Sequence, residues 1–235
     1  MPSTAPSDGS NHILDGLSRR GRDRILKECE HVTLAPNEIL LEPGRHIRHV
    51  HFPIAGVIAL MGAVDDHEGL ALGLVGSEGV LGSSLMLGTS LAPLRARVQV
   101  TGRALRIQVT ALELALADTP HLRRQLLLAH YEGMEQIAQI AACAIYHVVD
   151  VRIAYWLLMT HDRIRGDDFF LTHETLARML GVRRSGVTAA AGLLQDRKLI
   201  SYSRGYVSIL DRGGLEEIAC ECYRPAGSTM RHALS

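Results

Sequence analysis

Arg183, Arg184 and Ser185 stand side by side in the sequence, at the point where a helical pattern begins. Guanidinium and hydroxyl groups donate hydrogen bonds to phosphate oxygens, and arginine can also bind the edge of a guanine through two parallel bonds. A helix that presents these groups in its first turn is suited to the major groove of a duplex. The three residues therefore indicate a DNA-binding element.

Two predicted helices and a glycine turn would position these side chains. Thr172 can cap a first helix over residues 174–180, in which apolar residues recur at helical spacing. Gly181 ends this helix, because glycine adopts the left-handed conformation without a Cβ penalty. A second helical pattern runs from about 184 to 196 and keeps its apolar residues on one face. This order predicts a helix-turn-helix.

A predicted wing follows the second helix. Residues 199–202 and 207–210 alternate in polarity around a turn that contains Arg204. Helix pairs of this kind also occur in proteins that never bind DNA, where two arginines beside a turn are simply solvated. The wing, arriving in the expected order, favours DNA binding over that alternative.

Composition gives no global bias toward nucleic acid. The 235 residues carry 25 lysines and arginines and 25 acidic residues, so a basic surface must be local. Hydrophobic residues make up 47%, as is usual for a globular protein of one or two domains. No secretory signal or transmembrane-length apolar run is evident, which predicts a cytoplasmic protein that does not enter a membrane.

The four cysteines are scattered along the chain. They include one C-x-C pair, Cys220 and Cys222, and no C-x-x-C motif. This spacing indicates neither a disulfide framework nor a zinc knuckle, so we expect reduced thiols, no metal and no cofactor.

The first half of the chain changes from helical to strand-like patterns. Residues 1–12 are rich in Pro, Ser and Gly and predict a disordered tail. Residues 13–29 predict an amphipathic helix that is broken or bent near Gly21. Short apolar segments between turn signals then predict a compact β-barrel or roll, with strands at residues 38–41, 49–52, 57–61, 70–75, 96–100 and 104–107.

A long helix is predicted after the roll. A short helix over residues 110–117 ends before Pro120, which opens a helical pattern that continues to about residue 147. One apolar stripe approximates a heptad seam for a dimer: Leu126, Gly133, Ile137, Ile140 and Ala144. A second line, which would let the helix pack on the roll as well, comprises Leu127, Met134, Ala138, Ala141 and Ile145. The alternative is an ordinary buried helix.

The order of β-roll, long helix and winged helix-turn-helix resembles the Crp–Fnr family of bacterial transcription regulators. The resemblance is most specific in residues 182–200, VRRSGVTAAAGLLQDRKLI, and extends to residues 42–45, 52–58 and 76–82 in the roll. It implies a homodimer that places two recognition helices in successive major grooves of a palindromic operator. RNA polymerase is a further candidate partner.

Departures from the family concern both the effector and the operator. The family's cyclic-nucleotide sensors bind the ribose with a Gly-Glu pair and the cyclic phosphate with an Arg-Ser/Thr pair. Here Ser83 and Ser84 follow Gly82 in place of the glutamate, and Arg95 and Arg97 lack the neighbouring hydroxyl residue. These five residues are the candidate effector pocket, and cyclic AMP is not the expected ligand. The clustered N-terminal cysteines of the family's iron–sulfur sensors are also absent from the sequence.

The recognition helix keeps only part of the family pattern Arg-Glu-x-x-x-Arg. Arg184 matches the first arginine, but Ser185 and Ala189 replace the glutamate and the second arginine, so a different operator is expected. The resemblance assigns Arg184 as the guanine reader and Ser185 and Thr188 as secondary base contacts. Thr172, Arg183 and Arg204 would bind phosphates.

Two rival functions remain open. His49 and His51 on one strand project to one face, beside His46, and could hold a metal as in cupin-type enzymes. No carboxylate follows in the matching place, so we predict no enzymatic activity. The second rival is a regulator that has lost DNA binding and acts through protein partners.

The sequence therefore predicts an α+β chain with an antiparallel β-roll of jelly-roll (double-stranded β-helix) type, a long dimerisation helix and a winged helix-turn-helix. The predicted divisions are a disordered tail (1–12), a sensory roll with flanking helices (13–119), the dimer helix (120–147), the DNA-binding domain (148–225) and a loose tail (226–235).

Overall fold

A computed structural model describes residues 9–64 and 67–223 of the chain. Its larger sheet is antiparallel and has five strands: β1 (Glu30–Leu34), β2 (Ile39–Leu41), β3 (His49–Val64), β4 (His67–Val75) and β5 (Arg95–Gln108). The strand order is β1-β5-β3-β4, and β2 also pairs with β5. The α+β class and the antiparallel sheet predicted from the sequence are confirmed. The predicted tail over residues 226–235, and most of the one over residues 1–12, lies outside the described residues.

Two glycines explain why fewer and longer strands form than the sequence predicts. Gly56 and Gly102 each lie between two strands that the sequence predicts as separate. In the structure Gly56 lies inside the continuous strand β3 and Gly102 inside β5. The pairing between these strands shifts register around Ala55, and Gly56 has a φ of +88°. A Cβ on Gly102 would lie 1.9 Å from the carbonyl oxygen of Ala55. The glycines therefore form bulges that bend the paired strands around the roll instead of ending them.

The N-terminal segment also differs from the expectation. The segment forms two helices, α1 (His12–Asp15) and α2 (Arg19–Lys27), so the helix is broken. The break lies before Ser18, the N-cap of α2, and not at Gly21. Asn11 belongs to the segment predicted to be disordered, yet it is buried, caps α1 and donates to the carbonyls of Pro53 and Gly79. These interactions attach the start of the described chain to the roll.

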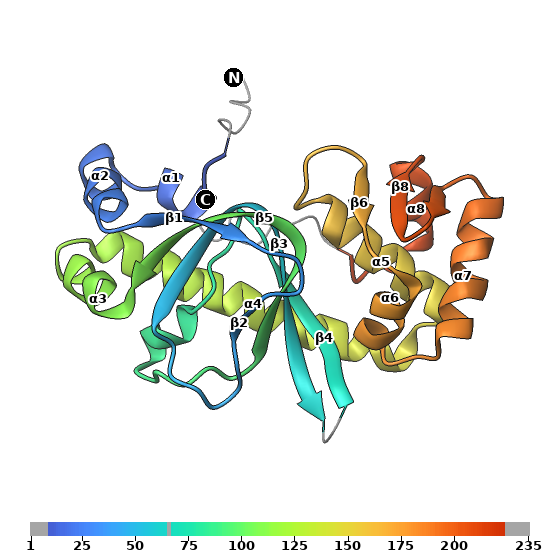
Figure 1. Ribbon diagram of the computed structural model, residues 1–235, viewed down its shortest axis with the longest axis horizontal. Coiled ribbons are helices and arrows are strands. Elements are labelled where there is room, and N and C mark those ends of the chain that lie inside the picture. Colours follow the sequence, from blue (N-terminus) through green and yellow to red (C-terminus); the bar gives the residue numbers. More distant parts are fainter. Residues whose placement is uncertain (1–8, 65–66, 224–235) are drawn as a thin grey trace.

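Helices connect the roll to the C-terminal domain. A short 3₁₀ helix η1 (Ser83–Leu87) follows β4, and α3 (Val109–Ala117) follows β5. The predicted long helix is α4 (Pro120–Tyr146), with Pro120 in its first turn. Figure 1 shows α4 running along the roll toward the C-terminal domain. It contacts both β4 and η1.

The C-terminal domain consists of α5 (Val149–His161), β6 (Asp168–Phe170), α6 (His173–Leu180), α7 (Arg184–Asp196), β7 (Ile200–Ser203), β8 (Tyr206–Ile209) and α8 (Arg212–Ile218). The sequence analysis did not predict β6, which pairs with β8 to make a three-stranded sheet in the order β6-β8-β7. The buried face of α5 supplies much of the core, and α7 and α8 pack against it. In Figure 1, α7 lies at the edge of the molecule farthest from α2.

Candidate DNA-binding face

The first helix of the pair is held in place by its cap and its terminal glycine. The Thr172 hydroxyl accepts a hydrogen bond from the Thr175 N–H at 3.1 Å, as an N-cap residue does. Gly181 ends α6 with a φ of +64°, and a Cβ there would lie 2.3 Å from the Leu70 side chain. Both predictions are confirmed, and Gly181 also lets the turn approach strand β4 of the roll.

Helix α7 separates an apolar face from a polar one. The buried face packs on α5 and α6 and contains Val187, Ala190, Ala191 and Leu194. Arg183 is the N-cap residue, and Arg184 and Ser185 form the first turn; all three side chains are exposed. The core therefore fixes the rotation of α7 and leaves its basic end in solvent.

Thr188 is exposed but already hydrogen-bonded. Its hydroxyl donates to the Arg184 carbonyl at 3.1 Å and lies 3.1 Å from Nδ1 of His173. The His173 ring lies 4.3 Å from that of Tyr202, and burial together with the nearby Arg184 charge lowers the pKa of His173. His173 thus joins α6, α7 and the wing. The sequence analysis did not single out His173, although this residue directly follows Thr172, the predicted helix cap.

The wing is present as predicted. β7 and β8 are joined by a tight turn in which Arg204 has a φ of +51° and Gly205 a φ of +86°. The Arg204 side chain is exposed at the tip, and the Tyr202 hydroxyl donates to the Leu171 carbonyl just before α6. The wing is thereby tied to the start of the helix pair.

Residues 151–218 match the family model of the Crp-like helix-turn-helix domain. This part of the chain is a Crp-like helix-turn-helix domain. A search of curated protein sequences found no significant match. Solved structures with the same fold include FixK2 from Bradyrhizobium japonicum, with 13% identity, coverage of 82% of this chain and 98% of that chain, and a TM-score of 0.69.

Two further structures extend this likeness. A CRP-family transcriptional regulator from Thermus thermophilus has 17% identity, coverage of 83% of this chain and 100% of that chain, and a TM-score of 0.66. The c-di-GMP-responsive regulator CLP of Xanthomonas campestris has 16% identity, coverage of 82% and 99%, and a TM-score of 0.65. The chain therefore has the Crp/Fnr fold throughout the roll, the long helix and the Crp-like domain.

The five residues of the candidate effector pocket have different partners in the structure. Gly82 precedes η1 with a φ of +104°. The hydroxyl oxygen of Ser83 lies 3.2 Å from Nδ1 of His130 on α4. Arg95 Nε donates instead to Glu42 at 2.9 Å. Arg97 lines a cavity of about 110 Å³ at the junction with the Crp-like domain, with Arg178 and Met179 of α6 among its other walls. Ser84, the fifth residue, is buried in η1.

The histidines of the roll line a different cavity, of about 280 Å³, together with Glu42, Arg45 and Arg48. The ring centroids of His49 and His51 are 6.5 Å apart. His46 Nδ1 lies 2.7 Å from Ser90 Oγ, within hydrogen-bond distance. Burial, then the charge of Arg106 and that of His49, lowers the pKa of His51 to about 4.

The long helix turns a different face outward from the one predicted as the dimer seam. Leu126 and Ile140 are buried within the chain against the roll and the Crp-like core, and Gly133, Ile137 and Ala144 are half-buried. In the single chain, Leu126 and Ile140 of the predicted seam are therefore not exposed. The exposed apolar positions of α4 follow the second line instead and include Leu127, Tyr131, Met134, Ala138, Ala141 and Ile145.

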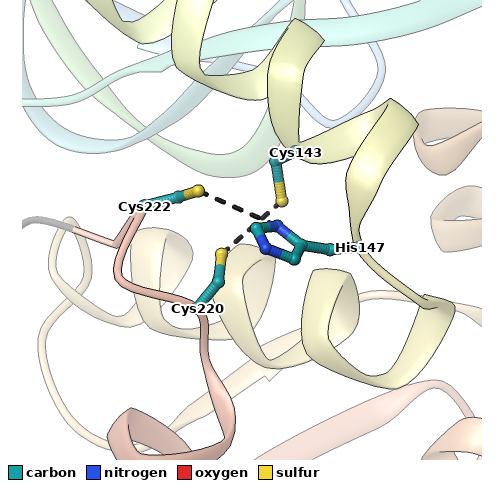
Figure 2. Close-up of side chains that lie close together, drawn as sticks. All are labelled: Cys143, His147, Cys220 and Cys222. Carbon is teal, nitrogen blue, oxygen red and sulfur yellow. Dashed lines mark hydrogen bonds between the residues drawn. The ribbon is translucent and has the colours of Figure 1, made fainter.

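Three of the four cysteines, expected to be scattered, converge with a histidine (Figure 2). Cys143 and His147 come from the end of α4, and Cys220 and Cys222 follow α8. Burial, with a hydrogen bond to Cys220, raises the pKa of Cys143 to about 12. The sequence contains only a weak signal for this site, a C-x₃-H on one helix and a C-x-C close to the end of the chain.

Among the described residues, no helix is both long and apolar enough to cross a membrane.

Proposed function

We propose that this chain is a cytoplasmic, homodimeric transcription regulator that binds duplex DNA through α7 and the wing. The observation that carries the proposal is the basic first turn of α7, exposed in solvent while the opposite face of the helix is fixed in the core. Arg184 would read a guanine, Ser185 and Thr188 would contact neighbouring bases, and Thr172, Arg183 and Arg204 would bind phosphates.

Local charge supports this assignment despite the neutral chain. Six basic side chains of the Crp-like domain are exposed around the helix pair and the wing: Arg178, Arg183, Arg184, Arg197, Lys198 and Arg204. Exposed basic side chains attract the phosphate backbone whatever the net charge of the whole protein.

The exposed face of α4 supports a parallel dimer. Its apolar residues alternate at spacings of four and three from Leu127 to Ile145, which is the pattern of a two-stranded coiled coil. Two chains joined along this face would present two α7 helices to successive major grooves, about 34 Å apart along a palindrome.

The roll would act as the sensor, but not for cyclic AMP in the family's usual manner. Arg95 is paired with Glu42, and the hydroxyl of Ser83 faces His130, so these groups have partners within the roll and α4. A ligand that changes the packing of the roll on α4 would alter the separation of the two reading helices.

The function is tested by incubating the purified chain with genomic fragments, sequencing those it retains, and titrating a random duplex at increasing salt. We expect enrichment of a palindrome and a steep fall of affinity with salt, because Lys and Arg release counterions from phosphates. A chain that retains no fragment and does not bind the random duplex would instead be the alternative, a regulator acting through protein partners.

A further inference from the structure

Cys143, His147, Cys220 and Cys222 meet where the end of the long helix approaches the end of the Crp-like domain (Figure 2). Each residue offers one ligand atom, and the four atoms lie within 4.8 Å of one another. The Sγ atoms of Cys143 and Cys220 are 3.7 Å apart, and Cys222 Sγ is 3.8 Å from Nδ1 of His147. Three thiols and an imidazole are thus brought together from segments far apart in the sequence.

These separations suit one tetrahedral ion. Zn–S bonds of about 2.3 Å and Zn–N bonds of about 2.0–2.1 Å place neighbouring ligand atoms about 3.5–3.8 Å apart around a tetrahedral centre. The four ligands of an iron–sulfur cluster are divided among two or more irons, so ligand atoms on different irons stand further apart than those around a single ion. Sulfur-rich tetrahedral sets select zinc among the common divalent ions. We propose that these four residues form a Cys₃His zinc site that ties the joint between α4 and α5 to the chain after α8.

The backbone holds the ligands in place on both sides. Cys143 and His147 are four residues apart at the end of α4, so they share one face of the helix. Cys220 and Cys222 lie in a turn in which the Tyr223 N–H donates to the Cys220 carbonyl at 2.9 Å. The Tyr223 hydroxyl then donates to Asp162 at 3.0 Å and accepts from Arg212 at 2.6 Å. This network fixes the cysteine turn against α5 and α8.

The surroundings also suit a charged centre. Three thiolates and one neutral imidazole around a divalent cation leave one negative charge, and the Arg152 guanidinium lies close enough to Cys143 to interact with it electrostatically. Gln139, one turn before Cys143, hydrogen-bonds to Cys222. His147, Cys220 and Cys222 are half-buried, so an ion can enter from solvent.

The proposed site does not depend on DNA binding, and its test does not use DNA. The full-length chain, without a histidine tag, is purified in reductant without chelator, and its metals and free thiols are counted. We expect about one zinc per chain in the wild type and in Cys29→Ser, the control that removes the cysteine outside the site, and below about 0.2 in Cys222→Ser.

A second measurement distinguishes the loss of metal from the loss of folding. Zinc removed from the wild type by chelation should lower the melting temperature by at least about 4 °C, and added zinc should restore it, with no such response in folded Cys222→Ser. Co²⁺ in place of zinc should give the visible spectrum of tetrahedral thiolate ligation. Any one of four results would overturn the proposal. They are less than about 0.2 zinc per chain in the wild type, acid-labile sulfide, a Cys143–Cys220 disulfide in place of metal, and unchanged zinc in Cys222→Ser.

Discussion

Arg163 Nε donates to Glu78 Oε1 at 2.8 Å across the junction between the roll and the Crp-like domain. The two side chains are only 4% and 12% exposed. Glu78 also accepts from the Gly76 N–H, and Arg163 donates to the Met159 carbonyl at the end of α5. The turn after β4 and the end of α5 are therefore joined by a buried ion pair whose groups have further hydrogen-bond partners.

Removal of this carboxylate should destabilise the chain. Glu78→Ala leaves a buried guanidinium without its counter-charge, so we expect the free energy of unfolding to fall by about 3–5 kcal/mol. Glu216→Ala is the matched control, because it breaks the exposed Arg212–Glu216 pair, and should cost under about 1 kcal/mol. Urea unfolding followed by circular dichroism measures both, and equal losses would show that the Arg163–Glu78 pair contributes no more than a surface pair.

Arg184→Ala tests the assignment of the reading residue. We expect specific DNA binding to weaken by about 1–3 kcal/mol and selectivity to relax at one base position, because a two-bond contact to guanine is lost. Arg20→Ala, in α2 at the far end of the molecule, should leave binding unchanged. Competition titrations against operator variants give both quantities. Unaltered affinity and selectivity in the Arg184 variant would remove that residue from the base-reading role.

Met134→Glu tests the exposed face of α4 as the dimer seam. Met134 is 54% exposed in the single chain, and a carboxylate at a seam position would be buried unpaired in each copy. We expect the dimer dissociation constant to rise by at least about a hundredfold. Leu114→Glu, at an exposed apolar position on α3, is the control. Sedimentation equilibrium gives the dimer dissociation constant of each variant. A Met134 variant that dimerises as tightly as the control would rule out this seam.

His51 should make stability depend on pH in the acidic range. Its pKa is lowered to about 4 in the folded chain, chiefly by burial, so the unfolded chain binds more protons between about pH 4 and the ordinary value near 6.5. Stability is therefore fully present above about pH 6.5 and falls as the pH drops toward 4, by roughly 2–3 kcal/mol.

His51→Gln removes this titration while keeping a polar side chain. Urea unfolding of the variant and the wild type at several pH values isolates the histidine, because other groups contribute equally to both. Parallel pH profiles would mean that His51 is not the group responsible.

Local signals predicted the Crp-like domain well. Thr172, Gly181 and the apolar face of α7 act within a few residues of one another, so cap, turn and helix rotation can be read directly from the chain. The strands of the roll were harder to predict, because Gly56 and Gly102 resemble strand ends in the sequence. Only the pairing of β3 with β5 shows that both strands continue through these glycines.

Features that depend on distant segments escaped the sequence analysis. Which apolar line of α4 is exposed depends on how the helix packs on β4 and η1, so Leu126 and Ile140 could not be separated from Met134 by spacing alone. Cys143 and Cys220 are 77 residues apart, and only the packing of α8 on α5 brings their sulfurs within 3.7 Å.

The connection between α4 and α5 consists of only His147 and Val148, both in extended conformation. With so short a connection, the backbone dihedral angles of these two residues act together with the contact of α6 with β4 and the Arg163–Glu78 pair to orient the Crp-like domain. A modest torsional change there would swing α7, at the far edge of the molecule, through an arc much larger than the movement at its origin. Under the proposed function, stiffness at these two residues would set how faithfully a rotation of the long helix becomes a displacement of α7.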